Sequence, residues 1–130
     1  MKHNTLLTIA SLLSLLFLTL HITDDIVRGI SKAEPSNTAL LVLTVFLYGT
    51  LVLAERRSGY IIILIASLLL VGIPVIHLRG VGVGFGTNRS NGLFFVWTLL
   101  AMGVTALFSV ILSVRGLLSL RHRSTSTPRT

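Results

Sequence analysis

The chain has 130 residues, of which 52% are hydrophobic and only 12% are charged, and its formal net charge is +7. These proportions lie far from those of a soluble globular protein, so we expect a fold that is solvated mainly by lipid. The absence of cysteine excludes disulfides, thiolate zinc sites, iron–sulfur clusters and dithiol redox chemistry. Because the basic residues form no stripe with interleaved aromatic side chains, we expect no nucleic-acid partner.

Four long stretches of the sequence contain no Lys, Arg, Asp or Glu. Each is long enough to cross a hydrocarbon core of about 30 Å as an α-helix of about 20 residues, in which every backbone polar group is satisfied internally. We therefore predict an all-α membrane protein whose domain, at 1–123, has four transmembrane helices in an antiparallel up-down bundle, over about 5–23, 36–54, 59–78 and 91–115. Residues 124–130 are predicted to form a disordered basic cytoplasmic tail.

The distribution of Lys and Arg predicts the orientation in the membrane, because short cytoplasmic loops retain positive charge. Four helices place both termini on one side. That side carries seven basic residues, which are Lys2, Arg56, Arg57, Arg115, Arg121, Arg123 and Arg129. The other side carries four, which are Arg28, Lys32, Arg79 and Arg89. We expect both termini to be cytoplasmic and the protein to lie in a bacterial cytoplasmic membrane.

A stripe of small side chains follows one face of the fourth predicted helix at four-residue spacing: Ala101, Thr105, Ser109 and Ser113. Small residues let membrane helices approach closely, either within the bundle or in a homo-oligomer or a complex with another membrane protein. Thr98 is expected on a different face of the same helix.

His21, Asp24, Asp25 and His77 form the candidate site, because the topology places them at the outer ends of the first and third helices. Helical spacings of three and four put both aspartates on the same face as His21. Imidazole nitrogens and carboxylate oxygens would then hold a divalent metal, whereas the two histidines alone would grip a haem. The alternative is purely structural: Asp24 pairs with Arg28 one turn later, and each histidine makes an ordinary hydrogen bond at the membrane interface.

No motif in the sequence ties the chain to a named family. Near the middle of the predicted spans there is no Asp, Glu, Lys or Arg, which disfavours ion-coupled transport. We therefore favour a non-enzymatic role, as an accessory or self-associating membrane component. The alternatives are a metal- or haem-binding membrane protein that uses the extracytoplasmic histidines, and a small transporter or channel subunit.

Overall fold

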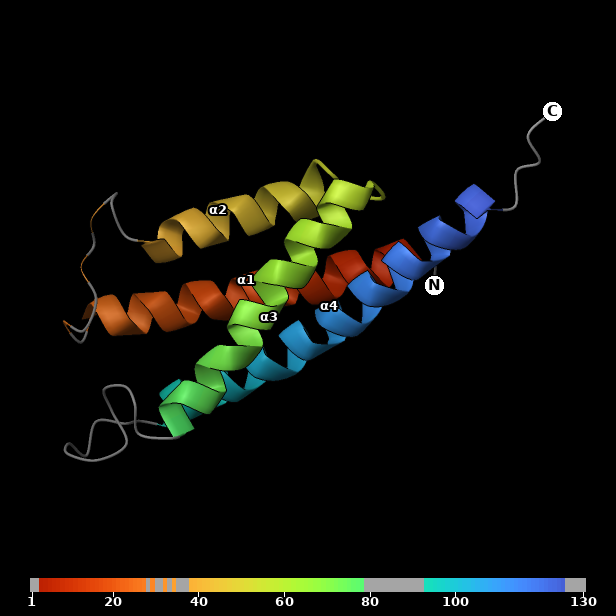
Figure 1. Cartoon of the computed structure of the whole chain (residues 1–130). Helices are drawn as coiled ribbons and strands as arrows, with labels where there is room; N and C mark the ends of the chain where they lie inside the picture. The colour runs from red at the N-terminus through yellow and green to blue at the C-terminus, as the bar shows by residue number, and fades with distance from the viewer. Residues whose placement is uncertain are drawn as a thin grey trace.

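The computed structural model describes residues 3–27, 29, 32, 34, 38–78 and 93–125. This part of the chain forms four helices, α1 (His3–Val27), α2 (Thr38–Leu51), α3 (Arg57–Leu78) and α4 (Leu93–Thr125), and contains no strand (Figure 1). The all-α prediction is confirmed. Three segments, Asn4–Val27, Arg57–His77 and Phe94–His122, are long and apolar enough to cross a bilayer, as expected of an integral membrane protein.

The four-span prediction is not confirmed, because α2 has only 14 residues. At about 1.5 Å per residue it is about 21 Å long, less than the roughly 30 Å of a hydrocarbon core. Its predicted end at 54 is too late because residues 52–56 turn the chain back. The amides of Val52 and Leu53 both donate to Tyr48 O, and Glu55 adopts a positive φ of 68°. Gly59 packs directly against Leu53 O, where a Cβ would overlap the carbonyl.

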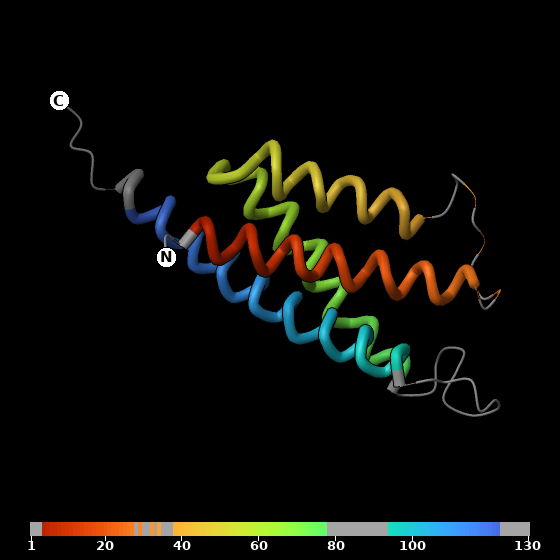
Figure 2. The backbone as a smooth tube through the Cα atoms, turned by 180° about the vertical axis from the view of Figure 1, so that it is seen from behind, coloured from red at the N-terminus to blue at the C-terminus, as the bar shows by residue number. Residues whose placement is uncertain are grey.

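The three long helices share one core, and α4 packs along both α1 and α3 (Figures 1 and 2). Each of these helices has one line of buried residues at alternating spacings of three and four, the pattern of knobs-into-holes packing, with further buried residues beside that line. On α1 they are Leu7, Ser11, Ser14, Leu18 and His21. On α3 they are Tyr60, Ile63, Ser67, Leu70 and Pro74. On α4 they are Phe95, Leu99, Met102, Ala106, Ser109 and Ser113.

Helices α1 and α3 run in the same direction and in register. At one end, the hydroxyl of Tyr60 donates a hydrogen bond of 2.6 Å to Asn4 Oδ1. At the other end, the ring centroids of His21 and His77 are 5.5 Å apart. In both pairs, Asn4 with Tyr60 and His21 with His77, the two residues are 56 positions apart in the sequence. Tyr60 also packs on Gly116 of α4. We call these two regions the tyrosine end and the histidine end.

Two expectations for α4 need correction. Thr98 does not lie on a face separate from Ser109 and Ser113: it is buried as they are, with 4% of its surface exposed, and its hydroxyl donates to Phe95 O. The buried face of α4 is wide because two helices pack against it, so it includes Thr98 as well as Ser109 and Ser113. The helix also continues to Thr125 rather than ending at 115, so the predicted tail at 124–130 begins inside α4, and residues 126–130 lie outside the described part.

Candidate functional site

The histidine end brings three rings from three helices into one layer. His21 lies near the end of α1, His77 in the last turn of α3 and Phe95 in the first turn of α4. The ring centroids of His21 and His77 are 5.5 Å apart, and Phe95 lies 5.2 Å from His21 and 5.7 Å from His77. Two of the residues singled out from the sequence are therefore neighbours, although they come from different helices.

The hydrogen bond of His77 defines which of its nitrogens is available to a ligand. Its Nδ1 lies 2.8 Å from Ile73 O. A carbonyl oxygen only accepts hydrogen bonds, so Nδ1 carries the hydrogen and donates it. In the neutral ring, Nε2 then bears the lone pair. Histidines that bind metals commonly have this arrangement, in which one nitrogen is held by a backbone carbonyl and the other faces the ion.

His21 is the more deeply buried of the two histidines, with 3% of its surface exposed. Its Nε2 lies 3.8 Å from Asp25 Oδ2, one helical turn further along α1. Its Nδ1 is buried, and no group in the described part of the chain hydrogen-bonds to it. A buried polar atom without a partner costs about 1–3 kcal/mol, so a ligand that reached this nitrogen would be favoured.

The two aspartates contribute unequally to this region. Oδ2 of Asp25 lies 3.8 Å from Nε2 of His21, whereas Asp24, the preceding residue on α1, is partly buried. The alternative pairing of Asp24 with Arg28 involves a residue outside the described part. Within the described ranges, no group of three or more His, Asp or Glu side chains is arranged to hold a metal ion. An ion at this end would therefore take two imidazoles from the protein and complete its coordination with water or a reoriented Asp25.

Phe95 was not among the residues selected from the sequence, and it distinguishes between the two ligands considered. Its ring contacts both imidazoles and fills the space beside them. A porphyrin gripped between His21 and His77 would have to displace this ring, whereas a single ion would not. The arrangement thus favours a small ion over haem. The signal in the sequence was its spacing, because Phe95 lies on the same helical line as Leu99 and Met102.

Comparisons with protein-family models, curated proteins and solved structures find no match to this chain. Its function is therefore inferred from its own residues and their geometry.

Proposed function

We propose that this membrane protein binds a divalent transition-metal ion between His21 and His77, in a non-enzymatic role. The observation that carries the proposal is the pairing of two imidazoles from separate helices, 5.5 Å apart between centroids. Imidazole nitrogen suits zinc, copper and nickel. Two nitrogens bound at about 2.0 Å to one tetrahedral ion are about 3.3 Å apart, so ligation requires the lone-pair nitrogens of both rings to turn toward a common point.

Both histidines have features that support ligation. Ile73 O holds the His77 ring with Nε2 as its lone-pair nitrogen. The unpartnered Nδ1 of His21 gains a partner when an ion binds. Asp25 adds a negative charge beside the site, which offsets part of the charge of a divalent cation in a region of low dielectric constant. An ion held in this way would join the ends of α1 and α3, which pack on each other less extensively than on α4.

The preferred role as an accessory or self-associating component stays a prediction, and only the less buried half of the small-residue stripe supports it. Ser109 and Ser113 are fully buried by other helices of the same chain. Ala101 and Thr105 are only partly buried, so this half of the stripe is what remains for a homo-oligomer or another membrane protein.

Metal binding is tested by titrating the full chain in detergent with Co²⁺ and recording the visible absorption of the ion. We expect one ion per chain, and at least a tenfold weaker affinity, roughly the effect of losing even an outer-shell partner, in His21→Phe and in His77→Phe. Phenylalanine keeps an apolar ring packed against Phe95.

The matched control is His122→Gln, because His122 is exposed near the far end of α4. It should leave the titration unchanged. A wild-type chain that gives no Co²⁺ spectrum, or a spectrum lost only in the His122 variant, would contradict the proposed function.

A further inference from the structure

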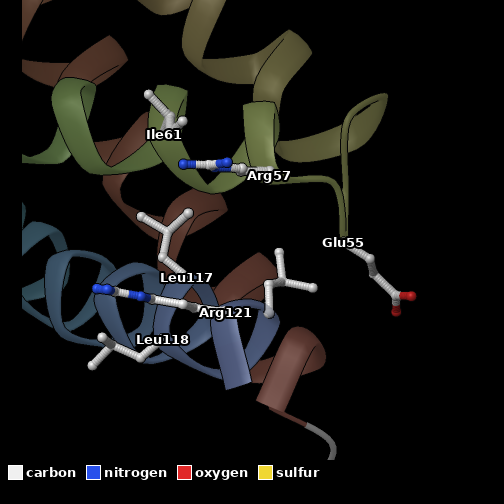
Figure 3. Close-up of a pocket in the computed structure, with 7 residues that line it drawn as sticks. Glu55, Arg57, Ile61, Leu117, Leu118 and Arg121 are labelled. Carbon is white, nitrogen blue, oxygen red and sulfur yellow. The ribbon is translucent and has the colours of Figure 1, made fainter. Parts of the chain in front are cut away.

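A groove of about 800 Å³ opens at the tyrosine end, between the beginning of α3 and the last turns of α4 (Figure 3). It exists because α4 continues beyond the level at which Gly116 packs on Tyr60, so its final turns extend past the close contact with α3. The residues that line it are Glu55, Arg57, Ile61, Leu117, Leu118, Leu120 and Arg121. The histidine site lies at the opposite end, so the groove is independent of the proposed metal binding.

The lining combines an apolar floor with a basic rim. Ile61 and the three leucines supply the apolar surface, whereas Arg57 comes from α3 and Arg121 from α4. In Figure 3 the two arginine side chains extend toward the same side of the groove with Leu117 between them, and Glu55 extends away from both. Two guanidinium groups against one carboxylate make the lining positive. A ligand that fits both surfaces has an anionic head and an apolar body.

The position of the groove along the helices matches the boundary between lipid headgroups and acyl chains. Arg57 is the first residue of one apolar span, Arg57–His77, and Arg121 is next to the end of another, Phe94–His122. Ile61 and Leu117 each lie one helical turn further into these spans. The basic rim is therefore at headgroup depth, and the apolar floor is at the depth where acyl chains begin.

We propose that this groove binds an anionic phospholipid. Arg57 and Arg121 hold the phosphate, which planar guanidinium groups bind through paired hydrogen bonds, and an acyl chain lies along Ile61, Leu117 and Leu118. Basic pockets between membrane helices are an established way of holding anionic headgroups. The net positive lining favours phosphatidylglycerol over the zwitterionic phosphatidylcholine.

The test is native mass spectrometry of the full chain in detergent, titrated with phosphatidylglycerol or with phosphatidylcholine of the same acyl chains. We expect tighter binding of phosphatidylglycerol, weakened roughly thirtyfold in the double variant Arg57→Gln and Arg121→Gln, the effect of losing two interfacial basic residues. The control is Arg56→Gln with Arg115→Gln, which makes the same change in charge at two exposed residues that do not line the groove. It should retain the affinity.

Two further arms separate a lipid from its headgroup alone. Leu118 is 50% exposed, so Leu118→Asn should leave the fold intact while weakening lipid binding. Inorganic phosphate is added as a competitor and should displace the lipid poorly. Equal loss of lipid in both arginine double variants would overturn the proposal in favour of general surface charge. Full displacement by phosphate, together with an unaffected Leu118→Asn, would overturn it in favour of a free-phosphate site.

Discussion

Gly116→Ala tests whether α3 and α4 pack at the tyrosine end as described. A Cβ at this position would lie 2.6 Å from Cδ1 and 2.7 Å from Cζ of Tyr60. The ring has little freedom to move, because Tyr60 is 6% exposed and its hydroxyl donates to Asn4. We expect the overlap to cost about 1–3 kcal/mol, partly offset by the roughly 0.5–1 kcal/mol that alanine gains over glycine within a helix. The net loss is about 1 kcal/mol, within a range of about 0–2.5 kcal/mol.

Gly72→Ala is the matched control, since Gly72 also lies within a long helix but nothing is within 4 Å of an added Cβ. This variant should be as stable as the wild-type chain or slightly more stable. The assay is equilibrium unfolding of the full chain in mixed micelles of increasing dodecyl sulfate content, followed by circular dichroism. If Gly116→Ala shifts the midpoint in the same direction as Gly72→Ala, the helix contact at Tyr60 is wrong.

Three further predictions use the same unfolding assay or a topology reporter. Ser109→Leu should destabilise the chain by about 1–3 kcal/mol through overpacking, whereas Phe108→Leu, at a 58% exposed residue, should change little; equal tolerance would place Ser109 toward lipid. Tyr60→Phe should lose about 0.5–1.5 kcal/mol with its hydrogen bond to Asn4, and Tyr48→Phe, at a 50% exposed residue, should lose almost nothing; similar losses would refute that bond. The start of α1 and the Gly116 region of α4 meet at the tyrosine end, so reporter enzymes fused to the two termini should be active on the same side of the membrane. The excess of basic residues at that end predicts that this side is the cytoplasm, and reporters active on opposite sides would contradict this topology.

The lengths of the apolar stretches predicted the helices but located the ends of the helices poorly. Val52 and Leu53 are apolar, so hydropathy places them in the second helix, yet their amides already belong to the turn in which Gly59 packs on Leu53 O. Conversely, Arg115 suggested a boundary that the helix does not have. Its long side chain is exposed on the surface of α4 and can extend toward the interface, so a single arginine does not end a span.

Which helices are neighbours was harder to predict than which segments are helical. Charge and topology placed His21 and His77 at the same end of the bundle, but not beside each other. The spacing of three and four along each helix is a better indicator of which residues face a neighbouring helix, because it places His21 on the same buried line of α1 as Leu18 and Ser14. Phe95 was not selected, because a phenylalanine side chain has no ligand atom that would mark it as part of a site. A ring that packs beside two histidines becomes visible only when three helices are assembled.

X-ray absorption spectroscopy of the zinc-loaded full chain tests the joint histidine site most directly, because it counts the imidazole ligands of the bound ion. The geometry of His21 and His77 predicts two imidazoles per zinc in the wild-type chain at about 2.0 Å, and one in His77→Phe. A wild-type spectrum without imidazole scattering, or one that neither His21→Phe nor His77→Phe changes, would contradict metal binding between α1 and α3.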